Sequence, residues 1–253
     1  MIFLIIIPFL LVIVFLFGVA QNGLSKEFGL VNDRFAAQLS SSVETNRIQA
    51  EALAKAIEEN SELINFISKD YTPGLDFSKY DRIVANNIKG FAKSRPDIII
   101  RIFMNNTSIP QGYGLFYQTD YLDRLPAVSD FIVSEEREIW LDMDSVASES
   151  PLQPTHPLYT TSHSYLYLKR LITYASNTLG YIAILVPQNT LIPVFKEGSK
   201  YTVQKYLGNI YVNNSNIAIT SKDMKSIVLQ GKQYGRYDKL AYSTFHMEPI
   251  PGR

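Results

Sequence analysis

The chain opens on nineteen uncharged and mostly apolar residues, Ile2 to Ala20. At about 1.5 Å of rise per residue, such a run in helical form covers most of a hydrocarbon core of roughly 30 Å. Pro8 does not exclude a helix, because a membrane-spanning helix tolerates proline where other groups satisfy the freed backbone. The pattern predicts a transmembrane or signal-anchor helix over residues 1–22, with the rest of the chain folded in water outside the cell membrane.

Two interpretations of this run stay open. Gly18-Val19-Ala20 is a small-residue tripeptide of the kind that precedes a signal-peptide cleavage site. A signal peptide normally has a basic start and an apolar stretch of about 7–15 residues, however. No Lys or Arg precedes Lys26 here. The length of the run and the missing basic start favour an uncleaved anchor, and either interpretation exports the bulk of the chain.

Apolar residues then recur at helical spacing over residues 23–69, which contain no proline. They are Val31, Phe35, Leu39, Val43, Leu53, Ile57, Ile64 and Ile67. A continuous helix of about 45 residues would be roughly 70 Å long. That length is typical of a stalk that rises from a membrane, often as a dimer. The alternative is two helices with a break near Ser40-Ser41-Ser42.

Beyond residue 70 the pattern changes from helices to strands. Thr72-Pro73-Gly74 predicts a turn, and residues 77–95 predict a second helix that ends before Pro96. Short runs of β-branched and apolar residues predict strands at 97–104, 114–118, 137–142, 163–175 and 179–187.

Helices and loops are expected between and after these strands. The sequence predicts short helices interrupted at Pro126 over 121–135, a loop over 144–162, a hairpin turn at 176–178, and a short helix over 189–197 capped by Asn189. The remaining elements are strand, turn and strand over 208–220, a helix over 221–230 capped by Ser221, and a strand pair over 234–247.

The element order indicates an α+β fold, because it is neither a βαβ repeat nor an all-β sandwich. We expect a mixed antiparallel sheet with inserted helices over residues 70–198. A smaller sheet unit over residues 199–253 follows it.

Composition narrows the functional classes. Lys plus Arg and Asp plus Glu each number 24, so the formal net charge is zero. A nucleic-acid-binding surface needs basic residues to neutralise phosphates, so we expect no nucleic-acid partner. The chain has no cysteine, which excludes disulfides, thiolate catalysis and cysteine metal ligands.

Motifs of catalysis and metal binding are also missing from the sequence. It lacks a glycine-rich phosphate loop, a GxSxG motif and an HExxH motif. Its three histidines have no metal-ligand spacing, and Asp142 and Asp144 lack the pattern of a calcium loop. We therefore expect no enzymatic activity, no cofactor and no metal in this chain.

Several stretches share a common likeness when taken in order. They are AIEENSELINFIS at 56–68, DIIIRIFMNNTSIP at 97–110, EREIWLD at 136–142, LGYIAILVPQNTLIPVF at 179–195 and GNIYVNNSNIAIT at 208–220. Their order and spacing resemble the extracellular Cache sensor region of YesM-type bacterial sensor histidine kinases. The resemblance covers nearly the whole chain.

This resemblance implies a double Cache domain, in which a membrane-distal PAS-like unit (70–198) and a smaller membrane-proximal unit (199–253) stack on the long helix. It also implies a second transmembrane helix, a HAMP linker and a cytoplasmic kinase beyond residue 253. The implied role is signal transduction in a two-component system by a homodimer joined through the long helix. The implied ligand is a small molecule or a solute-binding protein.

Other outputs stay open. The same sensor type fits a membrane-anchored AraC-type regulator, a chemoreceptor or a diguanylate cyclase. From different classes, an anchored or secreted solute-binding protein and an exported hydrolase are alternatives.

A ligand pocket needs aromatic walls and a few convergent polar groups. By their place in the resembled family, the candidates are Arg101, Arg137, Trp140, Tyr165, Tyr167 and Lys169. Strand alternation puts Tyr165, Tyr167 and Lys169 on one face, which is either the pocket wall or the outer, wet face of the sheet. Trp140 is either a core residue or a pocket wall, and Arg101 is either a ligand contact or half of a structural ion pair.

Amino-acid-sensing Cache domains carry an Arg-x-Trp-Tyr pattern. Here Arg137 is three residues before Trp140, and Leu141 follows the tryptophan. Amino-acid recognition is therefore not supported.

Overall fold

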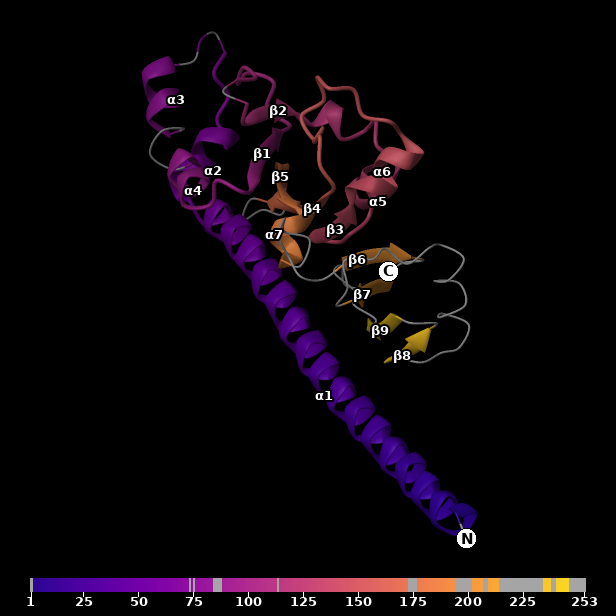
Figure 1. Cartoon of the computed structure of the whole chain (residues 1–253). Coiled ribbons are helices and arrows are strands. Elements are labelled where there is room, and N and C mark those ends of the chain that lie inside the picture. Colours follow the sequence, from indigo (N-terminus) through magenta and orange to yellow (C-terminus); the bar gives the residue numbers. More distant parts are fainter. Residues whose placement is uncertain are drawn as a thin grey trace. The chain divides into compact units, whose positions relative to one another are not determined.

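The computed structural model describes residues 2–72, 74, 76–83, 88–112, 114–172, 177–193, 202–206, 209–213, 234–237 and 240–245, in part by their backbone alone. The chain forms two compact units, one of residues 1–41 with 197–248 and one of residues 42–196 with 249–253. The described elements are a long helix, a five-stranded mixed sheet with helices, and a separate four-stranded sheet (Figure 1). The predicted α+β class is confirmed.

The long helix, α1 (Ile2–Glu58), passes through Ser40-Ser41-Ser42 without interruption. The alternative of two helices with a break at these serines is therefore wrong. The helix ends earlier than the expected residue 69, because Asn60 starts a new helix, α2 (Ser61–Ser68). The Asn60 side chain accepts a hydrogen bond from the Leu63 backbone N–H at 3.0 Å, which satisfies a donor that every helix start leaves unpaired.

Within the part of the chain that the structure describes, no helix has the length and apolar character required to cross a membrane.

The larger sheet has five strands in the order β2-β1-β5-β4-β3. The strands are β1 (Ile99–Met104), β2 (Phe116–Gln118), β3 (Glu138–Asp142), β4 (Ser164–Ile172) and β5 (Thr178–Pro187). All five lie where the sequence predicts strands, although Thr178 belongs to β5 and not to the preceding turn. The sheet is mixed, because β2 runs parallel to β1 whereas the other pairs are antiparallel.

Two of the described helices lie between α2 and β1, and two more lie between strands of the sheet. They are α3 (Phe77–Ile83), α4 (Lys89–Ser94), α5 (Pro126–Val133) and α6 (Met143–Glu149). The single helix expected over 77–95 is thus described as two. Pro126 starts α5 and does not interrupt it, because the first helical position needs no backbone N–H.

Two local predictions are wrong. The segment 144–162, expected as a loop, begins with α6, whose start is capped by Asp142 through a hydrogen bond from the Asp144 backbone N–H at 3.1 Å. Asn189 does not cap the short helix α7 (Gln188–Leu191) but lies inside it, and Pro187 occupies the cap position.

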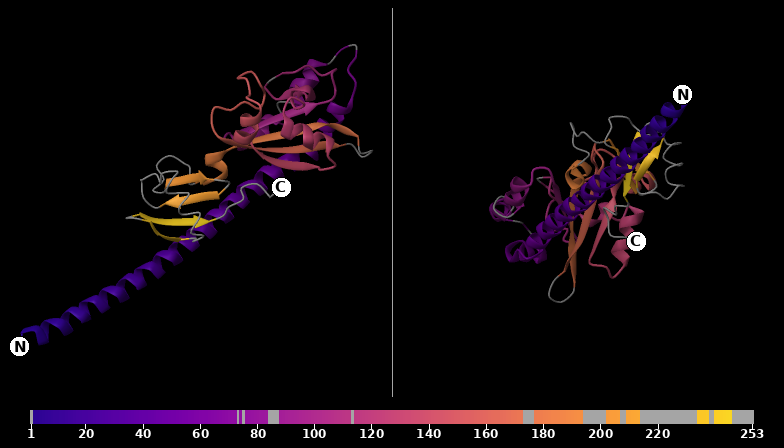
Figure 2. Two further views of the ribbon diagram at one scale, coloured as in Figure 1. Left: turned by 90° about the vertical axis from the view of Figure 1, so that its right-hand side faces the viewer. Right: turned by 60° about the horizontal axis from the view of Figure 1, so that its bottom comes forward.

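The two faces of the five-stranded sheet have different covers (Figures 1 and 2). On one face, α5, α6 and the segments beside them enclose an apolar cluster of Phe103, Leu122, Leu125, Val128, Phe131, Leu141, Met143, Val146, Leu158, Leu166, Leu168, Tyr181, Ala183 and Leu185. On the other face lie α2 and the last turns of α1. There the Phe66 ring lies 6.3 Å from the Phe116 ring, and Trp140 bonds to Glu51.

The smaller sheet has four described strands, β6 (Thr202–Tyr206), β7 (Asn209–Asn213), β8 (Tyr234–Tyr237) and β9 (Leu240–Phe245). Their order is β6-β7-β9-β8, and every described pair is antiparallel. β7, β8 and β9 lie in segments predicted as strands, whereas β6 was not predicted. The strand expected near 216–220 and the helix expected over 221–230 lie outside the described residues.

Candidate functional site

Three of the six predicted site residues gather where the sheet meets α1. Trp140 of β3 and Tyr167 of β4 are directly paired across the strands, and their rings lie 5.1 Å apart. Lys169 stands two residues further along β4 on the same face. The long helix covers this face at Tyr167, because Tyr167 is buried and its neighbours Trp140 and Lys169 contact α1.

Carboxylates on α1 and β3 complete this cluster. The Trp140 indole N–H donates to Glu51 Oε1 at 2.9 Å. The Tyr167 hydroxyl donates to Glu138 Oε2 at 2.6 Å. The Lys169 ammonium lies 3.0 Å from Glu138 and 3.4 Å from Glu58, so it bridges the sheet and the helix. We call Glu51, Glu58, Glu138, Trp140, Tyr167 and Lys169 the polar clamp.

Mutual stabilisation of charge is visible in the pKa values of the clamp. The hydrogen bond from Tyr167, and then the ammonium of Lys169, hold the pKa of Glu138 below its usual range although burial opposes this. Burial opposes the charged form of Lys169, but Glu138 and Glu58 outweigh it and raise the pKa of the ammonium. Burial, and then the bond to Glu138, raise the pKa of Tyr167. Tyr167 therefore stays neutral, Glu138 ionised and Lys169 protonated through the physiological range.

Further polar contacts hold the same stretch of α1. The Asn46 side-chain amide donates to the backbone carbonyls of Thr190 at 2.9 Å and Leu191 at 3.3 Å. The Arg95 guanidinium donates to the Gln49 side chain at 2.6 Å. Consequently this part of α1 has a fixed axial position against its own unit, because hydrogen bonds are directional where apolar packing is not.

Sequence reasoning missed Glu51 and Glu58 altogether. A signal was present, because Arg47, Glu51, Ala54 and Glu58 recur at helical spacing beside the apolar stripe. Charged residues on the inward side of an amphipathic helix indicate a polar partner on the element that it covers.

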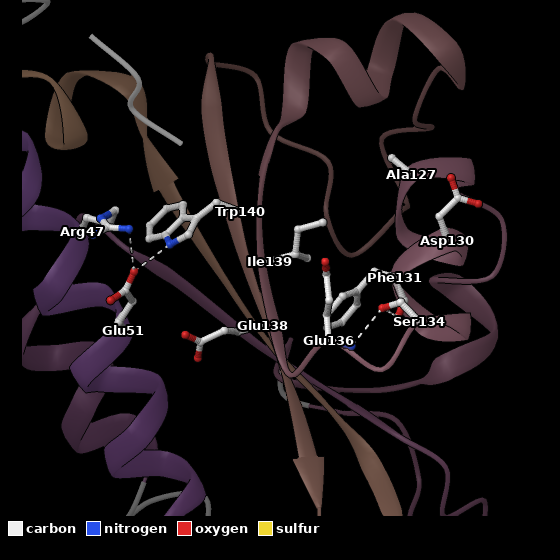
Figure 3. A pocket seen from close by; sticks show the side chains of 10 residues that line it. All are labelled: Arg47, Glu51, Ala127, Asp130, Phe131, Ser134, Glu136, Glu138, Ile139 and Trp140. Atoms are coloured by element: carbon white, nitrogen blue, oxygen red, sulfur yellow. Dashed lines mark hydrogen bonds and ion pairs between the residues drawn. The ribbon is translucent and has the colours of Figure 1, made fainter. Parts of the chain in front are cut away.

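An open groove runs along β3, beside the clamp (Figure 3). Its cavity volume is about 640 Å³. The lining residues are Arg47, Glu51, Ala127, Asp130, Phe131, Ser134, Glu136, Glu138, Ile139 and Trp140. Figure 3 shows that α1 supplies one wall and the segment of α5 and its following turn supplies the other, with β3 between them. Trp140 is therefore both a core residue and part of a groove wall.

The other three predicted residues lie outside the clamp, although Tyr165 shares its face of β4 with Tyr167 and Lys169. Arg101 faces the opposite side of the sheet, where it donates to the Pro157 and Ile100 carbonyls at 3.3 and 3.0 Å and lies 5.9 Å from the Tyr117 ring. Burial lowers the pKa of this guanidinium, and none of its contacts among the described residues is the carboxylate that a structural ion pair would require. Arg137 is exposed, and Tyr165 is buried.

The face of the sheet toward α5 and α6 is closely packed. The apolar cluster fills the space between the sheet and α5 and α6. Two smaller cavities, of about 320 and 250 Å³, lie on either side of the segment 159–162 at the edge of that cluster. Neither cavity includes any of the six predicted residues.

Among the described residues, no three side chains that could ligate a metal ion lie together. Asp142 is occupied in capping α6, and Asp144 lies 2.6 Å from the His163 ring nitrogen Nδ1.

Comparisons with protein-family models, with curated proteins and with solved structures found no match to this chain.

Proposed function

We propose that the chain is the extracytoplasmic sensor region of a membrane receptor, and that this receptor is a two-component sensor histidine kinase. In this proposal the N-terminal part of α1 anchors the chain in the membrane. The five-stranded sheet and its helices form the membrane-distal PAS-like Cache unit, and the four-stranded sheet belongs to the membrane-proximal unit.

The observation that carries the proposal is the continuity of α1. The helix extends from the apolar leader to the polar clamp without a break. On its N-terminal part the side chains of Leu11, Val12, Ile13, Val14, Phe15, Leu16, Phe17 and Val19 are each at least 50% exposed. Exposed apolar side chains of this kind mark a surface that another phase or partner covers, and in this proposal the covering phase is the apolar part of a membrane.

The clamp gives the proposed receptor a means of transmission. A shift of β3 or β4 would move Trp140 and Lys169, and through them Glu51 and Glu58 on α1. A rigid helix would carry that displacement along its axis. A ligand shifts such an equilibrium only by its difference in affinity for the two states.

We further propose that two copies associate through the outer side of α1. Ile48 is 52% exposed, whereas Ala54, on the side that faces the sheet, is fully buried. An exposed isoleucine on a long helix is suited to contact with the same residue of a second copy.

Cysteine substitution tests both the extracytoplasmic location and the dimer, because the chain has no cysteine of its own. The full-length chain with Ile48→Cys, expressed in a bacterium, should react with a membrane-impermeant maleimide in intact cells. It should also form a disulfide-linked dimer on mild oxidation. The matched control, Ala54→Cys, should do neither while the protein is folded.

Three outcomes would contradict the proposal. Labelling of Ile48→Cys only after cell lysis would place the unit inside the cell. Recovery of the mature protein in the medium with Gln21 at its N-terminus would favour a secreted binding protein. Equal dimer formation by both variants would show that the cross-link reports random collision.

A further inference from the structure

No described strand pairs with one edge of β3. It is the last strand of the five-stranded sheet, and among the described strands only β4 pairs with it. The Arg170 backbone N–H donates to the Arg137 carbonyl at 2.8 Å, which sets the alternation of the antiparallel ladder. Since Arg137 directs its carbonyl toward β4, Ile139 and Leu141 do the same, and Glu138 and Trp140 direct their backbone groups outward.

The open edge coincides with the groove of Figure 3. Unpaired backbone N–H and C=O groups on an edge strand are a template for pairing with another extended segment. The groove beside them has an apolar lining from Phe131, Ile139 and Trp140. Val133, at the end of α5, is 84% exposed and adds apolar surface close to Ser134 of the groove.

The groove is acidic. Asp130, Glu136, Glu138 and Glu51 line it, and Arg47 is the lining residue with a positive charge. Arg47 is already engaged by Glu44 at 2.7 Å and Glu51 at 3.6 Å. Asp130 and Glu136 make no ion pair with another described residue. The rim therefore carries negative charge that a partner can neutralise.

We propose that β3 binds an extended, basic segment of a partner protein, which adds to the sheet as a sixth strand. The backbone groups of Glu138 and Trp140 would pair with the segment, its basic side chains would face Asp130 and Glu136 on the α5 side of β3, and its apolar side chains would face Trp140 on the α1 side. Strand addition combines affinity from main-chain bonds with specificity from side-chain pockets.

A second copy of this chain fits the edge less well. Antiparallel pairing of β3 with its own copy would bring Glu136, Glu138 and Asp142 of one chain against the same acidic set of the other. Like charges that face each other across strands are destabilising. The charge of the groove thus selects a basic partner over self-association.

Trp140 supplies the measurement, because it is the only tryptophan of the chain and it lines the groove. The probe is a capped peptide of four Lys-Val repeats, titrated into the full-length chain in detergent micelles while the tryptophan fluorescence is recorded. Saturable change is expected with this peptide. A peptide of four Glu-Val repeats, and a lysine-valine peptide with a central proline, should leave the fluorescence unchanged.

Variants separate the contribution of the acidic rim from that of main-chain pairing. The double variant Asp130→Lys/Glu136→Lys should weaken binding roughly tenfold, mainly through slower association, because rim charges steer encounter. Charge reversal at the exposed Asp120 of the same unit should have no effect. Glu138→Pro removes an outward N–H and should speed dissociation relative to Glu138→Ala, which loses the same carboxylate but keeps the N–H.

The inference adds a class of partner to the proposed receptor, but its test does not depend on the membrane anchor or on signalling. Equal binding of the acidic or the proline-containing peptide would overturn it. So would identical dissociation rates for Glu138→Pro and Glu138→Ala. A concentration-dependent dimer that Glu138→Pro abolishes would assign the edge to a second copy instead.

Discussion

The two faces of the five-stranded sheet meet their covers by different means. Toward α5 and α6 the contact is apolar, and Leu166 and Leu168 of β4 are fully buried in it. Toward α1 the neighbouring residues of the same strand, Tyr167 and Lys169, form hydrogen bonds and ion pairs with carboxylates. Adjacent positions on one strand thus serve two interfaces with different physics.

One face therefore mainly supplies folding stability, and the other mainly fixes the position of α1. Apolar burial is non-directional and roughly proportional to area, so the α5 and α6 face supplies free energy of folding without demanding one register. The clamp on the α1 face gains little net energy from each bond, but its geometry fixes where the helix lies. A face that transmits movement to a helix needs the second kind of contact.

The largest expected effect is on the apolar face. Leu168→Ala removes a fully buried side chain and should lower the free energy of unfolding by about 3 kcal/mol, from lost burial and the cavity left behind. Urea denaturation of the full-length chain, followed by circular dichroism, measures it. Val133→Ala on the exposed side of α5 is the control and should change the midpoint little. Equal losses would mean that the apolar cluster is not the main source of stability.

The second-largest loss of stability is expected from a change in the polar clamp. Trp140→Phe keeps an aromatic ring beside Tyr167 but removes the N–H that bonds to Glu51, and it should cost about 2 kcal/mol because a charged acceptor loses a partner. A double-mutant cycle with Glu51→Gln, read by urea denaturation, isolates the bond. Strict additivity of the two changes would show that the indole and the carboxylate are not coupled.

Replacing the bridging ammonium is expected to cost less. Lys169→Met keeps most of the side-chain volume and loses the ion pairs with Glu58 and Glu138, so we expect a loss of about 1 kcal/mol, since both carboxylates reach solvent. The more informative readout is disulfide formation by Ile48→Cys, which Lys169→Met should alter if the clamp positions α1. An unchanged cross-linking rate would limit Lys169 to a structural role.

The smallest effect is a pH dependence. The folded-state pKa of Glu138 is lower than its unfolded value, so this carboxylate stabilises the fold above the unfolded pKa, and the contribution is lost as the pH falls through the folded pKa. Glu138→Gln should therefore flatten the acid side of the stability curve while leaving its shape above pH 6 unchanged. Urea midpoints between pH 3 and 7 test this. Parallel curves for the two proteins would contradict it.

Local pattern was sufficient for much of the fold. The runs of β-branched residues predicted all five strands of the larger sheet, and the absence of proline predicted that α1 continues through its serines. The sequence alone did not predict α6, because Ser and Asp residues that usually mark loops here serve as its cap and its exposed side. It also did not predict the end of α1, since Asn60 looks like an ordinary helical residue until its side chain is seen to cap α2.

The candidate site likewise has features that the sequence predicts and features that only the tertiary structure shows. Alternation alone determined that Tyr167 and Lys169 share a face, because side chains on a strand point to opposite sides in turn. Only the tertiary structure decided what that face meets, since Glu51 and Glu58 come from a helix more than a hundred residues earlier in the chain. The open edge of β3 is likewise a property of strand order, which depends on contacts between distant segments and has no local signature.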